Sequence, residues 1–143
     1  MAPGAGARRR ARECALQVLY SVDLNPGWTV DQALAAFWRD FDEDRDADHA
    51  FAEKLVRGAL AHQDELDRLI QAASKNWRLE RMARVDRNIL RLATYELLHE
   101  PDVPAKVVIN EAIEVAKRFG TAESPAFVNG LLDRISQEAP RRD

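Results

Sequence analysis

The sequence predicts an all-α fold, and two observations support that prediction. Apolar residues recur at steps of three and four in one segment after another, the spacing that places them along one face of a helix. No segment shows the alternation of apolar and polar residues between hairpin turns that is typical of a β-strand. Turn-forming residues separate the helical segments, with Asn25, Pro26 and Gly27 early in the chain and Pro101 and Pro104 later.

The first predicted helix runs from Ala7 to about Asn25 and is strongly basic on one side. Residues 1–6 are rich in glycine and alanine and are expected to form a disordered tail. Tyr20 lies on the same helical line as Arg9. The apolar face consists of Ala7, Ala11, Cys14, Ala15, Val18 and Val22, and four arginines lie off it: Arg8, Arg9, Arg10 and Arg12.

This basic surface is a candidate contact for single-stranded RNA. Arginine pairs with phosphate and stacks on bases, and tyrosine offers a further stacking platform. An arginine run is equally typical of a solubilising face or a charged tail. The residues alone leave both interpretations open.

Three further amphipathic helices are predicted in the middle of the chain. Thr29 or Asp31 is the expected cap of the first. The acidic run Asp40–Asp48 contains no glycine, so it does not match an EF-hand loop and favours a solvated loop leading into a helix. Lys75–Arg84 is predicted to be a short connection with at most one helical turn. The predicted helices are Thr29–Phe41, Ala47–His62 and Gln63–Ser74.

The next predicted helix is the most apolar of the chain. Asp86 is its expected cap, and apolar residues cover most of its circumference, as in a helix surrounded by others. Glu96, embedded in this apolar sequence, is interpreted as a paired structural carboxylate rather than a catalytic one.

Two helices around one turn end the chain. The apolar stripe of the first runs from Ala105 to Phe119, and Gly120 is expected to stop this helix in a left-handed conformation. Ser124 is the expected cap of the last helix, with Pro125 at its first position. Gly130 lies in the middle of that helix, where glycine costs about 1 kcal/mol relative to alanine. Close approach of a neighbouring helix or of a ligand explains such a glycine, and helix packing is the commoner reason.

Composition limits the classes of function. A chain of 143 residues with a net charge of −3 suits one domain with room for two subdomains, and it binds polyanions only through a local basic patch. Cys14 is the single cysteine, which excludes an intrachain disulfide and fits a reducing cytoplasm. We expect no membrane span and no signal peptide. His49, His62 and His99 share no helix-face spacing, so we expect no metal site, no cofactor and no catalytic residues.

Four blocks of sequence carry a resemblance to a known family. They are RRRARECALQVLY, DRNILRLATYELL, KVVINEAIEVAKRFG and FVNGLLD, in this order. Together they make the chain similar to the NusB family of bacterial transcription antitermination factors, over nearly its whole length apart from about Asn25–Arg84. The resemblance implies about seven helices in two packed bundles within one compact domain, and we place the N-terminal subdomain at about 7–76 and the C-terminal one at about 77–137.

The resemblance also implies a function and a set of RNA contacts. A NusB-like protein binds the boxA element of nascent RNA together with the ribosomal protein NusE. It thereby joins the complex that keeps RNA polymerase elongating through terminators in ribosomal RNA operons. The family's RNA-binding N-terminal helix maps onto the four arginines and Tyr20, and its second RNA-facing segment maps onto the turn Glu123–Phe127.

Within this second segment, three residues are candidates for base recognition. Glu123 and Asn129 are expected to hydrogen-bond to base edges. Phe127 is by composition a core residue, but the resemblance favours base stacking for it. Glu123 stands where the family often has aspartate, and Ala126 where lysine can occur, so this segment departs from the family pattern.

Two other functions are compatible with the sequence. A helical module that binds only protein, or a second copy of itself as a homodimer, needs the arginines only for solubility. An RNA-guiding domain of the kind attached to some RNA methyltransferases is less favoured, because this chain has no room for the methyltransferase.

Overall fold

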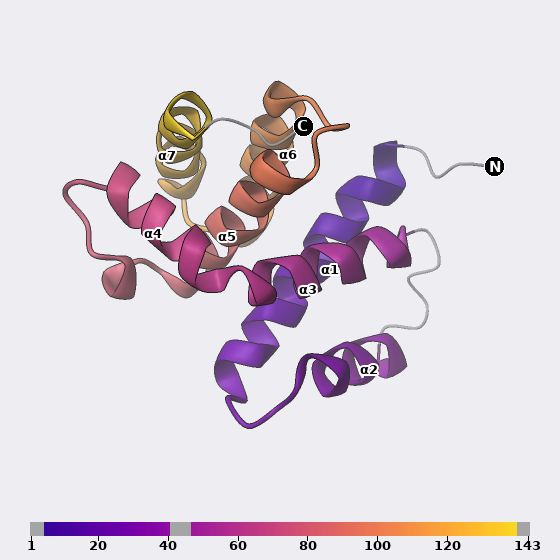
Figure 1. Cartoon of the computed structure of the whole chain (residues 1–143). Coiled ribbons are helices and arrows are strands. Elements are labelled where there is room, and N and C mark those ends of the chain that lie inside the picture. Colours follow the sequence, from indigo (N-terminus) through magenta and orange to yellow (C-terminus); the bar gives the residue numbers. More distant parts are fainter. Residues whose placement is uncertain (1–4, 41–46, 140–143) are drawn as a thin grey trace. The chain divides into compact units, whose positions relative to one another are not determined.

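The computed structural model describes residues 5–40 and 47–139, and every regular element within these ranges is helical (Figure 1). This confirms the predicted all-α fold. The α-helices of the described ranges are α1 (Ala5–Leu24), α2 (Val30–Asp40), α3 (His49–Ala61), α4 (Gln63–Ala73), α5 (Arg84–His99), α6 (Ala105–Phe119) and α7 (Ser124–Glu138), and a 3₁₀ helix, η1 (Leu79–Arg81), precedes α5.

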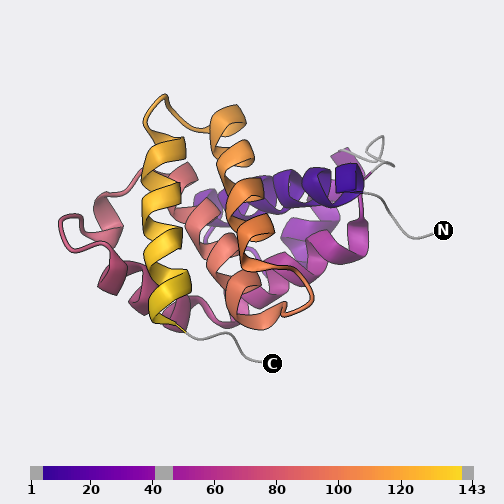
Figure 2. The ribbon, with the colours of Figure 1, turned by 90° about the horizontal axis from the view of Figure 1, so that it is seen from above.

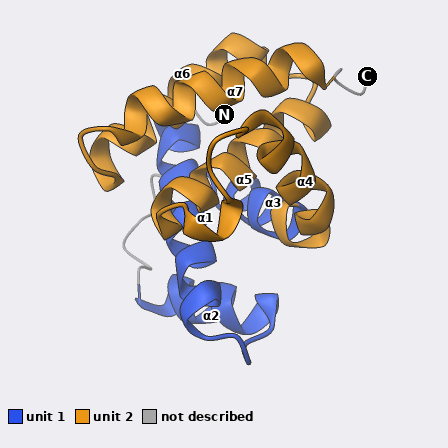
Figure 3. Cartoon of the chain, turned by 90° about the vertical axis from the view of Figure 1, so that its left-hand side faces the viewer, with its two compact units in different colours: residues 1–58 blue, residues 59–143 orange. Residues whose placement is uncertain are grey.

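The chain divides into two compact units, Met1–Gly58 and Ala59–Asp143 (Figure 3). The boundary falls within α3, whose last residues belong to the second unit. The predicted subdivision near residue 76 concerns helical bundles rather than compact units, and it stays a prediction. None of the described helices is both long enough and apolar enough to cross a lipid bilayer.

In the first unit, α1 packs against α2. Ala11, Cys14 and Ala15 are fully buried along α1, as the sequence predicts. Thr29 caps α2 through a reciprocal pair of hydrogen bonds with Gln32, since each side chain accepts the backbone N–H of the other residue, at 3.1 and 2.8 Å. α1 begins at Ala5, two residues before its predicted start; the rest of the predicted tail, and residues 41–46 of the acidic run, lie outside the described ranges.

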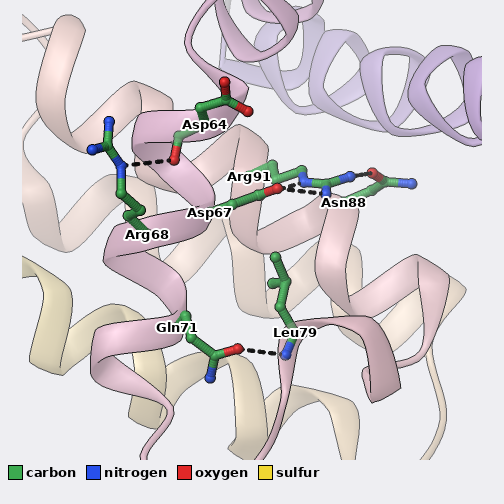
Figure 4. Close-up of polar contacts among 7 residues, drawn as sticks. All are labelled: Asp64, Asp67, Arg68, Gln71, Leu79, Asn88 and Arg91. Atoms are coloured by element: carbon green, nitrogen blue, oxygen red, sulfur yellow. Dashed lines mark hydrogen bonds and ion pairs between the residues drawn. The ribbon is translucent and has the colours of Figure 1, made fainter.

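In the second unit, α5 packs against α4, α6 and α7, and Figure 2 shows α6 and α7 side by side. α5 is buried over most of its length, as its apolar sequence predicts. It also buries Arg91, whose guanidinium makes two hydrogen bonds of 2.7 and 2.9 Å to the carboxylate of Asp67 on α4 (Figure 4). The two charges compensate each other, so this pair joins α4 to α5 at the edge of the core.

The start of α5 differs from the prediction. The helix begins at Arg84, and its N-cap is Ala83, which has no side-chain capping hydrogen bond. Asp86 is therefore the third residue of the helix and not its cap. A carboxylate in the first turn still interacts favourably with the helix dipole, which is why an acidic residue here suggests a cap.

Gly120 ends α6, but not in the predicted left-handed conformation. Its backbone is extended, with φ −96° and ψ −164°. The glycine is required for space, because a Cβ atom at this position would lie 2.5 Å from Cβ of Ser124 and 2.9 Å from the carbonyl oxygen of Ala116.

Ser124 is also placed differently from the prediction. It is the first residue of α7 rather than its cap, and Pro125 is the second. Its buried hydroxyl oxygen accepts the backbone N–H of Thr121 at 2.9 Å. Gly120 and Ser124 therefore form one tight corner between α6 and α7.

Candidate nucleic-acid interface

The four predicted arginines of α1 differ in exposure. Arg8 and Arg9 are exposed, and Arg10 is half-buried. Arg10 donates a hydrogen bond of 2.9 Å to the carboxylate of Glu13 one turn later. Arg12 is only 7% exposed. Arg8 and Arg9 are therefore the arginines of α1 that present most surface to a ligand.

Phe51 of α3 orders two of these arginines. The guanidinium carbon of Arg8 lies 4.4 Å from the centroid of the Phe51 ring, and that of Arg12 lies 5.1 Å from it. Both distances are within the range of a cation–π interaction. Arg8 is thus held against an aromatic ring while its exposed face stays accessible, and this reduces the conformational entropy that it loses when it binds phosphate.

Tyr20 completes the predicted set on α1. Its side chain is 39% exposed, which is unusual for a large aromatic residue on a packed helix. The exposed ring can stack on a base, the role predicted for it from the sequence.

The remaining predicted residues belong to the second unit, at the beginning of α7. Glu123 and Asn129 are exposed, and Phe127 is half-buried. Glu123 accepts a hydrogen bond of 3.1 Å from the hydroxyl of Thr121, which positions its carboxylate beside the corner before α7. The predicted residues thus form two sets, one in each unit: Arg8, Arg9, Arg10, Arg12 and Tyr20 in the first, and Glu123, Phe127 and Asn129 in the second.

Two hollows flank Phe127 and Trp77. The first, which we call the carboxylate hollow, has a volume of about 400 Å³. Trp77, Met82, Ala83 and Phe127 give it apolar walls. Arg81, Asp86 and Glu123 add charged groups. An apolar slot bordered by a few hydrogen-bonding groups is the arrangement that binds an unstacked base.

Asp86 has an unusual environment in the carboxylate hollow. Its Oδ1 atom is buried and has no hydrogen-bond partner among the described residues. A buried oxygen without a donor costs roughly 1–3 kcal/mol, so such groups in native proteins call for an explanation. A ligand N–H donor, as on a base edge, would satisfy the Asp86 carboxylate.

The second hollow, which we call the basic hollow, has a volume of about 230 Å³. Lys75 and Arg134 contribute positive charge to its lining. Gly130 also lines it, and a Cβ atom added there would meet nothing within 4 Å. Close approach of a neighbouring helix, the commoner explanation for such a glycine, therefore does not account for Gly130, and the space beside it is open to a ligand. Other residues of the lining are Ser74, Asn76, Trp77, Ala126, Phe127 and Leu131.

Trp77 stands between the two hollows and lines both. Its side chain is 58% exposed, the highest value among the large hydrophobic residues of the described ranges. Hydrogen bonds to Gln71 and Ser74 fix its loop. The carbonyl oxygen of Trp77 accepts from Gln71 Nε2 at 2.8 Å and from Ser74 Oγ at 3.0 Å. Gln71 Oε1 also accepts the N–H of Leu79 at 2.8 Å, a contact that Figure 4 shows. The ring is therefore presented to solvent from a fixed loop.

Sequence reasoning missed several residues of this surface, chiefly Trp77, Asp86, Lys75 and Arg134. One signal could have identified Trp77, since tryptophan in a short polar connection has little core to enter. For Asp86 the sequence predicted only the role of a helix cap. No sequence pattern links Arg134 to Ala73, 61 positions earlier, yet the Arg134 guanidinium donates a hydrogen bond of 2.9 Å to the carbonyl oxygen of Ala73.

The chain is similar to known proteins over most of its length. The model of the NusB family matches residues 9–137. The transcription antitermination protein NusB of Myxococcus xanthus is 52% identical over 134 residues, which cover 92% of this chain and 95% of that protein. The NusB protein of Geobacter sulfurreducens is 53% identical over 135 residues, covering 94% and 97%.

Solved structures agree with the sequence comparisons. A structure of T. maritima NusB has a TM-score of 0.82 and 41% sequence identity, and the match covers 93% of each chain. A crystal structure of antitermination factors NusB and NusE in complex with dsRNA has a TM-score of 0.82 and 28% identity, covering 94% of this chain and 98% of that one.

Proposed function

The chain belongs to the NusB family, and from this premise we propose that it is a transcription antitermination factor that binds boxA-type RNA together with the ribosomal protein NusE. In this role it supports processive transcription of ribosomal RNA operons as part of the RNA polymerase antitermination complex. It acts in the cytoplasm as an RNA- and protein-binding adaptor, not as an enzyme, and its RNA contacts need no cofactor.

One observation supports the RNA-binding role most strongly. Trp77 and Phe127 line both hollows. Asp86 and Glu123 border the carboxylate hollow, and Lys75 and Arg134 border the basic hollow. Carboxylates accept hydrogen bonds from base edges, whereas lysine and arginine bind phosphate. A base in the carboxylate hollow would donate hydrogen bonds to the carboxylates, and a phosphate in the basic hollow would bind the lysine and the arginine.

The form of RNA that this surface fits is single-stranded. Aromatic walls and hydrogen bonds to base edges serve bases that are unpaired and unstacked, whereas a double helix is recognised mainly through its phosphates and 2′-hydroxyls. The related NusB–NusE structure contains dsRNA, so the strandedness of the preferred ligand is itself part of the test.

The arginines of α1 contribute to the affinity for RNA rather than to the preference for one RNA sequence. Each phosphate contact by an arginine adds about −0.7 to the slope of log K against log salt for a single strand, or about −1.4 for the two exposed arginines, Arg8 and Arg9. That dependence corresponds to a modest affinity, which a protein partner such as NusE can strengthen.

The proposal is tested by fluorescence anisotropy with a labelled single-stranded boxA-type RNA, a scrambled RNA of the same length and a matched duplex. Each is titrated with the protein alone and with NusE. We expect the protein to bind the single-stranded boxA-type RNA more tightly than the scrambled RNA or the duplex, and to bind it more tightly still when NusE is present. Equal, weak binding to all three RNAs, unchanged by NusE, would instead favour the protein-interaction module or a homodimer.

A further inference from the structure

His62, Glu65 and His99 form a cluster that the sequence does not predict. All three belong to the second unit: His62 directly precedes α4, Glu65 lies in the first turn of α4, and His99 is the last residue of α5. One potential ligand atom from each side chain can be chosen so that all three lie within 4.8 Å of one another. The sequence spacing of the histidines gave no sign of this, because the fold brings together the ends of two different helices.

The distances within the cluster fit a shared cation better than direct hydrogen bonds. His62 Nδ1 lies 3.8 Å from Glu65 Oε2, and His99 Nε2 lies 3.8 Å from Glu65 Oε1. Both separations exceed the length of a hydrogen bond. In a tetrahedral Zn²⁺ site with bonds of about 2.0–2.1 Å, ligand atoms lie roughly 3.3–3.4 Å apart, a spacing that these side chains can reach by rotation.

Ring stacking keeps the two imidazoles close together. The rings of His62 and His99 are stacked, with centroids 4.4 Å apart and planes inclined by 25°. The ring of Tyr95 stacks on His99 at 5.0 Å. A metal ion lies in the plane of each imidazole that coordinates it, so the two rings must rotate out of this stacking to share one ion.

The surroundings are suitable for a positive ion. His99 ends α5, where the helix dipole is negative, so a cation is favoured there. The side chains of His62, Glu65 and His99 are 40%, 32% and 15% exposed, which leaves a route for an ion from solvent. Two imidazole nitrogens and one carboxylate match the preferences of Zn²⁺ and similar transition metals, whereas Mg²⁺ and Ca²⁺ prefer oxygen ligands.

We propose that His62, Glu65 and His99 form a binding site for one divalent transition-metal ion such as Zn²⁺, with water completing the coordination. The bound ion connects the beginning of α4 to the end of α5, the same two helices that the Arg91–Asp67 pair joins. The site is independent of RNA binding, so its presence or absence does not bear on the function proposed above.

Isothermal titration with Zn²⁺ alone, on the full chain without a histidine tag and near pH 7.5, tests the proposal. The expected result is one ion per chain, with affinity at least tenfold weaker in His99→Gln and in Glu65→Gln and unchanged in the control His49→Gln. His49 stacks on Trp38 in the first unit and has no part in the cluster. Thermal unfolding provides the second readout, because an ion that binds only the folded state raises the Tm of the wild type by several degrees.

Two results would contradict the proposed metal site. One is a wild-type protein that takes up no Zn²⁺ at 100-fold molar excess and shows no change in Tm. The other is Zn²⁺ binding that His62→Gln, Glu65→Gln and His99→Gln all leave unchanged. His62 is well exposed, so its replacement preserves the fold and keeps the second result interpretable.

Discussion

Arg8 lies over the ring of Phe51, with its guanidinium carbon 4.4 Å from the ring centroid. This contact joins α1 to α3 within the first unit and holds one exposed arginine in place. It explains how an acidic chain, with a net charge of −3, presents an ordered positive surface at its N-terminal helix.

The arginines of α1 should determine the salt dependence of RNA binding. Replacing Arg8 or Arg9 by glutamine is expected to reduce the magnitude of the salt slope by about 0.7 for each lost phosphate contact. The measurement is the dissociation constant for boxA-type RNA over a series of salt concentrations. Arg39→Gln is the matched control, because Arg39 lies on α2 with its side chain 75% exposed. Equal slopes for all variants would show that the arginines of α1 do not contact phosphate.

Trp77 should provide stacking energy. Removal of an aromatic residue that stacks on a base costs roughly 1–3 kcal/mol, so Trp77→Ala is expected to weaken RNA binding by about 5- to 150-fold. Trp28→Ala is the control, since Trp28 is also exposed but lies in the turn before α2, in the first unit. The same loss in both variants, measured by anisotropy, would mean that the effect is not specific to the two hollows.

Asp86 should contribute to sequence preference more than to affinity. Asp86→Asn keeps the size of the side chain but removes its charge, and we expect the preference for boxA-type over scrambled RNA to fall about tenfold, as for loss of one charged hydrogen bond. Competition binding with the two RNAs measures this ratio. The control Asp102→Asn changes an exposed carboxylate outside both hollows. An unchanged ratio in Asp86→Asn would exclude a base contact by this residue.

The glycines Gly120 and Gly130 should respond in opposite ways to replacement by alanine. Gly120→Ala forces a Cβ atom into Ser124 and is expected to lower the free energy of unfolding by about 1–3 kcal/mol. Gly130→Ala meets no atom and is expected to raise it by up to about 1 kcal/mol, while RNA binding weakens because the basic hollow loses space. Urea unfolding and anisotropy separate the two effects. A free energy of unfolding that is lower for Gly130→Ala than for the wild type would contradict the open space beside Gly130.

Helices were the feature that the sequence predicted best. Apolar spacing located every α-helix of the described ranges, because a 3.6-residue period shows directly which face is buried. The α6 helix ends at Phe119, directly before Gly120, as predicted, and the buried residues of α7 include Val128, Leu131, Leu132 and Ile135, as expected. Helix ends were less accurate because capping depends on local backbone geometry, as Asp86 and Ser124 illustrate.

Features that depend on contacts between distant residues were not predictable. Gly120 suggested a left-handed turn because that is a frequent role of glycine after a helix, whereas the actual reason is the packing of Ser124. The clustering of His62 with His99 likewise depends on how α4 packs against α5, which no local pattern records. For the candidate interface, the sequence identified Phe127 but not its neighbour Trp77, because their proximity arises from the tertiary fold.

Ultraviolet crosslinking of boxA-type RNA in the presence of NusE, followed by mass spectrometry of the peptides, tests the central claim most directly. Aromatic residues that stack on bases crosslink efficiently, so the expected adducts lie on the peptides that contain Trp77 and Phe127, with a further adduct at Tyr20. Adducts confined to other segments, with the Trp77 and Phe127 peptides unmodified, would contradict the claim that the two hollows receive the RNA.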